Sequence, residues 1–150
     1  MLVFDAYPLA AVLLGEPAGK ASGQILADAL ARGDAHVSVA NLAEVVDLVA
    51  RLASADAADV LDAVELWIDA GLHVRPLNWE TAARAASLRT THYHRTRCAV
   101  SLSDCVAVAL ATELGATLVT SDQPMVTVAV ASGVRVKPIP NSRGVSPSDR

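Results

Sequence analysis

Cysteine and aromatic residues are scarce in this sequence. Its 150 residues include two cysteines, Cys98 and Cys105, and two tryptophans, two tyrosines and one phenylalanine. Because there is no CxxC pair and no cluster of cysteine and histidine at zinc-ligand spacing, we expect neither a disulfide framework nor a structural zinc site. The small number of aromatic side chains excludes base stacking as the main mode of nucleic-acid recognition. This cysteine usage predicts a reducing, cytoplasmic location.

The sequence also lacks a surplus of positive charge and a long uninterrupted apolar run. The formal net charge is −4 at pH 7 and the isoelectric point is near 5.4. No overall cationic field can therefore hold nucleic acid, and any such site must be local. Asp5, Pro8 and Glu16 interrupt the apolar N-terminal run, and Glu113 interrupts the run at 105–119. We therefore expect neither a signal peptide nor a membrane span.

Apolar residues, in contrast, are abundant and arranged in a regular order. They make up 53% of the sequence, which predicts one domain with a substantial core. Short runs rich in β-branched residues alternate with longer helical patterns, which predicts an α/β fold with a mostly parallel sheet of four to five strands. Helices on both faces would make a three-layer α/β/α sandwich. We expect this domain to span residues 1–140, followed by a mobile Ser/Pro/Arg tail at 141–150.

Local signals place the elements along the chain. Ser101 and Asp104 match a capping box before an apolar helix that Gly115 ends, and Asn41 is predicted to cap another helix. The buried stripe of that second helix is expected at Leu42, Val45, Val46, Val49 and Leu52. Pro76 would place the strand at 73–77 at a sheet edge. Strands are predicted at 2–4, 36–39, 73–77, 116–120 and 134–137. Helices are predicted at 7–14, 21–30, 41–52, 79–90, 104–114 and 123–131, with a further helix that begins at Ser54 or Asp56 and runs to residue 70.

Four acidic residues occupy similar positions relative to these elements. Asp5 follows the first strand, Glu44 lies in the first turn of the helix after the second strand, Asp104 lies at a helix start, and Asp122 follows the strand at 116–120. Helix capping and the helix dipole explain each acid singly. If they converge at the carboxyl ends of adjacent strands, two charges about 4 Å apart repel by about 4 kcal/mol at an effective dielectric of 20. Such a cluster of hard oxygen ligands predicts a Mg²⁺ or Mn²⁺ site.

These segments resemble the PIN-domain ribonucleases, and among them the small bacterial VapC-type toxins of toxin–antitoxin pairs. The resemblance rests on the order and spacing of LVFDA, SVANLAEVVDLVARL, LSDCVAVALATELGATLVTSD and, within the last of these, a T-x-D signature. It implies a PIN-like fold in which four acids are catalytic and bind the metal: Asp5, Glu44, Asp104 and Asp122. It also implies supporting polar side chains at Thr120, Ser121 and Asn41. Two departures from the family pattern are Ala6, where Ser or Thr is common, and Gln123-Pro-Met125.

The function implied by the resemblance is a metal-dependent endoribonuclease that hydrolyses RNA phosphodiester bonds as the toxin of a type II toxin–antitoxin pair. Its expected partners are RNA, a cognate antitoxin and a second copy of the chain. Early apolar residues could form the partner surface or belong to the core: Leu9, Val12, Leu13, Ile25 and Leu26. The basic stretch at 90–97 is predicted to be an exposed loop with candidate RNA contacts at His92, His94, Arg95 and Arg97.

Two alternatives share parts of this pattern. A phospho-accepting receiver domain has a parallel sheet with acids at strand ends and a Lys-Pro pair, as at Lys137-Pro138. It also needs an acidic pair after the first strand and an aspartate after the third, where this chain has only Asp5 and then Pro76-Leu-Asn-Trp. The other alternative is a non-catalytic PIN-like RNA-binding module, which would bind RNA in the presence of a chelator without cleaving it.

Overall fold

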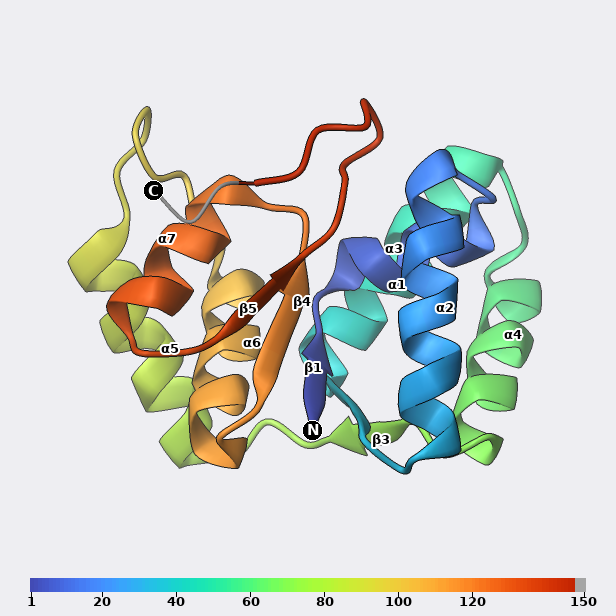
Figure 1. Ribbon diagram of the computed structural model, residues 1–150, viewed down its shortest axis with the longest axis horizontal. Helices are drawn as coiled ribbons and strands as arrows, with labels where there is room; N and C mark the ends of the chain where they lie inside the picture. Colours follow the sequence, from blue (N-terminus) through green and yellow to red (C-terminus); the bar gives the residue numbers. More distant parts are fainter. Residues whose placement is uncertain (148–150) are drawn as a thin grey trace.

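The sheet has five strands that are all parallel. The structure is a computed structural model that describes residues 1–147. The strands are β1 (Leu2–Phe4), β2 (Ala35–Ser38), β3 (His73–Arg75), β4 (Thr117–Thr120) and β5 (Val136–Pro138), in the order β3-β2-β1-β4-β5 (Figure 1). This confirms the predicted α/β class and makes the sheet wholly parallel. The first strand of the chain is the central strand of the sheet.

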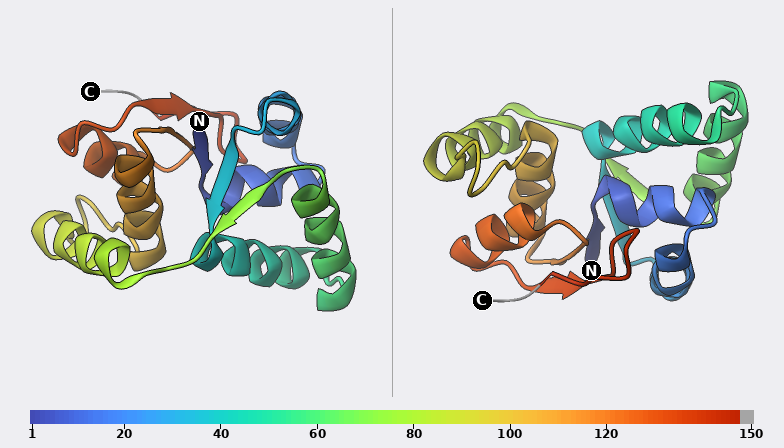
Figure 2. Two further views of the ribbon diagram at one scale, coloured as in Figure 1. Left: turned by 90° about the horizontal axis from the view of Figure 1, so that it is seen from below. Right: turned by 90° about the horizontal axis from the view of Figure 1, so that it is seen from above.

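Helices cover both faces of the sheet, which gives the predicted three layers (Figures 1 and 2). On one face lie α1 (Ala6–Leu13), α2 (Pro17–Ala31), α3 (Val39–Ala53) and α4 (Ala57–Asp69), and on the other α5 (Trp79–His92), α6 (Leu102–Leu114) and α7 (Gln123–Ala131). Strand side chains alternate between the two layers: Val3 and Leu118 pack with α6 and α7, whereas Phe4 and Val119 pack with α1 and α3. Burial on both faces explains why β1 is apolar throughout and why Leu118 and Val119 follow each other in β4, whereas the edge strands β3 and β5 are more polar and more exposed.

The strand order also distinguishes between the fold alternatives. Receiver domains have the order 2-1-3-4-5, with the third strand beside the first. In this chain β4 takes that place and β3 lies at the edge beside β2. The receiver interpretation is therefore wrong. The edge position predicted for the strand before Pro76 is confirmed.

The start of α3 differs from the prediction. Its N-cap is Ser38 rather than Asn41: the Ser38 Oγ accepts a hydrogen bond from the Asn41 backbone N–H at 3.0 Å. The reason is that β2 leads into the helix without a loop, so the last strand residue is also the cap. Because α3 begins at Val39, Glu44 lies in its second turn and not, as predicted, in the first. Leu52 does not belong to the buried stripe and is 61% exposed, because residues 51–54 at the end of the helix are all exposed.

The segments before and after the last helices also have defined structure. Residues 90–92 of the predicted loop continue α5, and the loop itself is closed by two backbone hydrogen bonds between His94 and Cys98, 2.9 and 3.0 Å long. After β5, residues 141–147 form what we call the C-terminal turn, in which the Asn141 N–H donates to the Val145 carbonyl at 2.9 Å. The mobility predicted for residues 141–150 stays a prediction, and residues 148–150 lie outside the described part.

Throughout residues 1–147, every helix is too short or too polar to cross a membrane.

Candidate functional site

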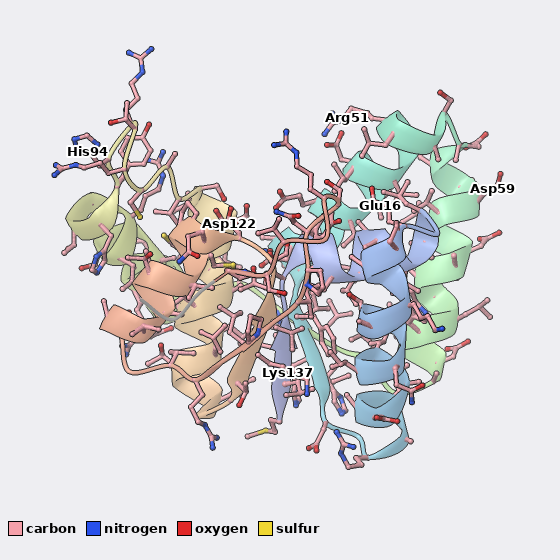
Figure 3. The ribbon with its side chains drawn as sticks, turned by 45° about the horizontal axis from the view of Figure 1, so that its top comes forward. Glu16, Arg51, Asp59, His94, Asp122 and Lys137 are labelled. Carbon is pink, nitrogen blue, oxygen red and sulfur yellow. The ribbon has the colours of Figure 1, made fainter. Side chains whose placement is uncertain are left out.

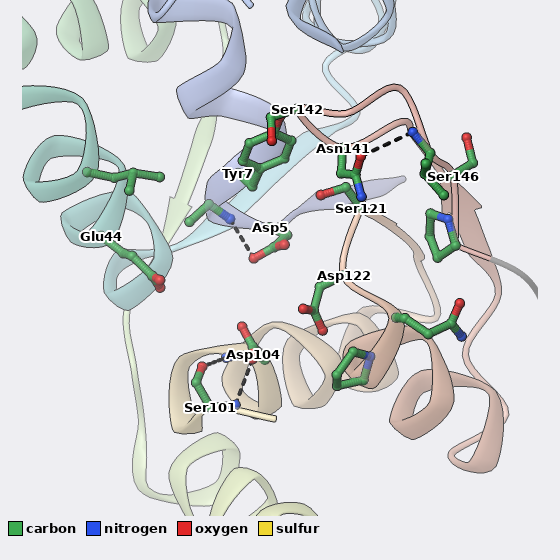
Figure 4. A pocket seen from close by; sticks show the side chains of 16 residues that line it. Asp5, Tyr7, Glu44, Ser101, Asp104, Ser121, Asp122, Asn141, Ser142 and Ser146 are labelled. Carbon is green, nitrogen blue, oxygen red and sulfur yellow. Dashed lines mark hydrogen bonds between the residues drawn. The ribbon is translucent and has the colours of Figure 1, made fainter. Parts of the chain in front are cut away.

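A cavity of about 630 Å³ opens at the carboxyl ends of β1 and β4. The chain order reverses between these two strands, which is the position where open parallel sheets bind ligands. The cavity is lined by the N-terminal ends of α1, α6 and α7, by Glu44 of α3 and by the C-terminal turn (Figure 4). All four predicted acids line it, so the structure brings together carboxylates from four separate elements.

Asp5 is the most buried of the four acids, with 5% of its surface exposed. It caps α1: Oδ1 accepts from the Ala6 N–H at 2.7 Å, and Oδ2 accepts from the Thr120 hydroxyl at 2.8 Å. Burial raises the Asp5 pKa to about 7, and the charges of Asp104 and Glu44 add to this, although both hydrogen bonds act in the opposite direction. In the absence of a cation, this carboxyl group is therefore partly protonated at neutral pH.

Asp104 is held by the predicted capping box at the start of α6. Its Oδ2 accepts from the Ser101 N–H at 2.7 Å, and its own N–H donates to the Ser101 Oγ at 3.0 Å. The helix start thus fixes one carboxylate oxygen, while the side chain points into the cavity (Figure 4). Asp104 and Asp5 face the same cavity, and the charge of Asp104 adds to the effect of burial in raising the Asp5 pKa.

Asp122 caps α7 in the same manner. Its Oδ1 accepts from the Met125 N–H at 2.7 Å, and its own N–H donates to the Thr120 Oγ1 at 3.1 Å. Burial raises the Asp122 pKa, as does the charge of Asp104. The buried Thr120 hydroxyl therefore connects two of the acids, and Ser121 between Thr120 and Asp122 lines the cavity directly.

Glu44 and Asn41 both come from α3 but have different environments. Glu44 is exposed and points toward the other three acids (Figure 4). Asn41 is fully buried and does not line the cavity. Its Oδ1 accepts a short hydrogen bond from the Ser38 hydroxyl, and its Nδ2 donates to the Ser103 carbonyl at 3.3 Å. Asn41 thus ties the start of α3 to the first turn of α6, where Asp104 lies.

The chemistry of the cavity fits a hard divalent cation. Its lining has carboxylate, hydroxyl and amide oxygens and, among the described residues, no histidine, cysteine, lysine or arginine. Oxygen ligands of this kind suit Mg²⁺ or Mn²⁺. Within residues 1–147 no three acidic, histidine or cysteine side chains form a ready-made metal site, so the carboxylates would have to turn toward a shared ion.

The four predicted RNA contacts do not line the cavity: His92, His94, Arg95 and Arg97. His94 stabilises its own turn, because its Nδ1 accepts from the N–H groups of Thr96 and Arg97, both at 3.3 Å. The loop nevertheless stands at the end of the molecule where β1 and β4 have their carboxyl ends (Figure 1). Figure 3 shows His94 at the side of this end and Asp122 nearer its centre.

Sequence reasoning missed Tyr7 and the residues of the C-terminal turn that form part of the cavity wall. The Tyr7 hydroxyl donates to Glu16 at 2.5 Å, and burial together with this partner raises the Tyr7 pKa to about 12. Tyr7 follows Asp5 closely in the sequence, and this proximity could have indicated that Tyr7 lines the same cavity. The turn has no comparable local signal, because its position depends on how β5 pairs with β4.

The sequence matches a known protein family, and the fold resembles a solved structure. A family model described as PIN domain matches residues 2–130. No curated protein sequence matches the chain significantly. Among solved structures, the crystal structure of FitAcB from Neisseria gonorrhoeae is similar: it is 20% identical, has a TM-score of 0.65, and the match covers 97% of this chain and all of that chain. At this identity the likeness concerns the fold.

Proposed function

This chain belongs to the PIN-domain family, and from that premise we propose that it is a metal-dependent endoribonuclease that hydrolyses RNA phosphodiester bonds. The observation that carries the proposal is the convergence of Asp5, Glu44, Asp104 and Asp122 on one open cavity. The match to the family covers all four. Like charges held together in a partly buried cavity are tolerable when a cation balances them.

Asp5, Asp104 and Asp122 are the residues we assign to hold the metal, with Glu44 at the exposed side. If Mg²⁺ or Mn²⁺ binds there, it would lower the pKa of a water molecule and would balance the negative charge that develops on the phosphate. Thr120 keeps the carboxylate of Asp5 in a fixed orientation through its hydrogen bond. Because the Asp5 pKa is about 7, the proton on its carboxyl group must leave before a cation can bind there.

We also propose that the nuclease is the toxin of a type II toxin–antitoxin pair, as the resemblance to VapC-type toxins implies. A cognate antitoxin would cover the acidic cavity, and the chain would form a homodimer in the cytoplasm. Of the apolar residues considered for a partner surface, Leu9 and Leu26 belong to the core, whereas Val12, Leu13 and Ile25 are only half-buried. The half-buried residues are the ones that stay candidates.

The loop after α5 is proposed as an outer RNA contact. His92, His94, Arg95 and Arg97 supply a local group of basic side chains in an acidic protein, and all but the half-buried His92 are exposed. Because these side chains lie outside the cavity, their contacts with phosphate groups would orient a long RNA without reading its sequence.

The proposed function is tested by incubating the purified chain with structured RNA in Mg²⁺ or Mn²⁺ and in a chelator. Asp5→Asn, Asp104→Asn and Glu44→Gln should each abolish cleavage. Asp47→Asn is the matched control, since Asp47 is an exposed acid of α3 that pairs with Arg51 at 2.8 Å instead of facing the cavity. Cleavage that persists in both aspartate variants would refute the assignment. RNA binding by the wild type without any cleavage would favour the non-catalytic module.

A further inference from the structure

The acidic cavity has no positive charge of its own, which matters if its substrate is RNA. Among the described residues that line it, none is lysine, arginine or histidine. An RNA strand carries a negative charge at every phosphate, so the phosphates beside the reacting one need cations at the cavity edge. If the proposed function holds, a segment at that edge must supply the positive charge.

The C-terminal turn supplies a candidate. Asn141, Ser142, Val145 and Ser146 line the cavity, and Arg143 is an exposed residue between Ser142 and Val145. Within residues 1–147 its guanidinium group has no ion-pair or hydrogen-bond partner. Arg143 is therefore the cation of a segment that otherwise forms the cavity wall.

Other cations in the fold are already engaged or come from segments that do not line the cavity. Arg51 pairs with Asp47 at 2.8 Å and Arg32 pairs with Asp34 at 3.3 Å. Arg75 donates to His36 at 3.3 Å, and the Arg89 guanidinium lies 4.4 Å from the centre of the Tyr93 ring.

The turn that carries Arg143 is a closed structure. The Asn141 Oδ1 accepts from the N–H groups of Arg143 and Val145 at 2.9 and 3.1 Å, and the Asn141 carbonyl accepts from the Gly144 N–H at 2.9 Å. Gly144 has a φ of 75°, a left-handed conformation that glycine adopts without strain. The backbone on either side of Arg143 is thereby fixed.

The turn is also anchored to the rest of the site. The Ser142 side chain lies beside Tyr7 in the cavity wall (Figure 4). The Tyr7 hydroxyl in turn donates to Glu16, the N-cap residue of α2. Just before the turn, the Ile139 N–H donates to the Thr120 carbonyl at 3.0 Å, and the Ile139 side chain is buried. These contacts connect the turn to the same strand end that carries Thr120 and Asp122.

We propose, resting on the proposed function, that the C-terminal turn is a substrate-positioning wall and that Arg143 binds a phosphate of single-stranded RNA next to the scissile one. The turn lies beyond residue 130, where the match to the family ends. Arg143 takes no part in bond breaking. It compensates the repulsion between the RNA backbone and the four acids, and the turn fixes the path of the strand past Asp122.

Binding of a fluorescein-labelled single-stranded RNA oligonucleotide, measured against salt concentration, tests this proposal. The measurement uses Asp104→Asn protein at a fixed Mg²⁺ concentration, so that cleavage does not interfere. Adding Arg143→Ala should weaken binding and reduce the slope of log K against log salt by about 0.7, the value for one lost phosphate contact on a single strand. Arg143→Lys should keep the slope.

Arg135→Ala is the matched control, because Arg135 is an exposed arginine of the same C-terminal segment that lies just before β5, whereas Arg143 follows it. The slope of log K against log salt for Arg135→Ala should equal that of the Asp104→Asn protein without a second change. In otherwise wild-type protein, Arg143→Ala should raise KM with a smaller effect on kcat. An unchanged slope in Arg143→Ala, or an equal loss in Arg135→Ala, would overturn the assignment.

The failure of this inference and of the proposed function can be told apart. If cleavage requires Asp5 and Asp104 but Arg143→Ala leaves the salt slope unchanged, only the role of Arg143 is wrong. If the wild type cleaves no RNA while Arg143→Ala still lowers the salt slope, the nuclease assignment fails and the phosphate contact stands.

Discussion

The hydroxyl of Thr120 donates a hydrogen bond to the carboxylate of Asp5 at 2.8 Å, although the two residues are 115 positions apart in the sequence. The same hydroxyl oxygen accepts from the Asp122 N–H. One buried side chain at the end of β4 therefore fixes the geometry of acids that follow two neighbouring strands. Its hydrogen bond also lowers the Asp5 pKa against the larger effect of burial.

Thr120→Val should shift the pH dependence of cleavage to higher pH. The variant keeps the shape of the side chain but removes the donor to Asp5, so the Asp5 pKa should rise above about 7. The variant also removes the hydroxyl oxygen that accepts from the Asp122 N–H, at a cost of about 1–3 kcal/mol in the free energy of unfolding. The test is the profile of kcat/KM against pH, with Thr120→Ser as the control that keeps the hydroxyl. Identical profiles for wild type and Thr120→Val would contradict the prediction.

The Asp5 carboxyl group should contribute a loss of stability to the metal-free protein as pH rises from about 4 to about 7. The Asp5 pKa is 3.8 in the unfolded chain and about 7 in the folded one, so in this range the folded state binds more protons. The loss from this group is at most about 4 kcal/mol. Denaturant unfolding in EDTA at several pH values measures it. Asp5→Asn should remove most of the loss, and Mg²⁺ should reduce it by binding the charged form. Equal pH dependence in wild type and Asp5→Asn would refute this account.

His36 should act in the opposite direction. Burial lowers its pKa to about 4, and the charges of Arg75 and His73 add to this; the His73 ring stacks on it with 4.8 Å between centroids. Between this value and 6.5 the unfolded chain binds more protons, so stability falls as pH drops from about 6.5 to about 4, by at most about 3 kcal/mol. His36→Asn should flatten this acid limb, measured as the difference from wild type. The same change at the exposed His94 should leave it unaltered.

Asn41→Ala should impair the site without touching a metal ligand. It breaks the link from α3 to the Ser103 carbonyl, and the buried Ser38 hydroxyl loses the Asn41 Oδ1 that accepts its proton. We expect a loss of about 1–3 kcal/mol in the free energy of unfolding and a decrease in kcat at saturating metal. Unfolding curves and metal-dependent rates measure the two effects. If Asn41 itself were a ligand, the variant would instead need much more metal and regain the full rate.

Much of the fold could be predicted because its signals are local. The capping box of Ser101 and Asp104 and the left-handed Gly115 lie within the helix that they delimit. Three of the four acids lie within the first turn of a helix or cap it. These helix starts lie at the carboxyl ends of the strands, where open parallel sheets bind their ligands. The period of the apolar residues then sets which faces are buried.

The rest depends on contacts between distant segments. Ser38 ends a strand and caps a helix at once, so the pattern around Asn41 suggested the wrong cap. The buried role of Asn41 requires α6 to lie beside α3, 62 residues further along the chain. The C-terminal turn has the composition of a solvated tail, and only the pairing of β5 with β4 brings it over the cavity.

The central position of β1 has a consequence for the synthesis of the protein. Residues 2–4 leave the ribosome before the rest of this domain, yet they become the middle strand, which pairs with β2 on one side and with β4 on the other. Domains fold during translation only when their parts have emerged, and here Asp5 meets Asp122 after almost all helices are made. A growing chain therefore carries no assembled cavity until β4 has emerged, and a product that stops before β4 lacks both Asp122 and the Thr120 hydroxyl that holds Asp5.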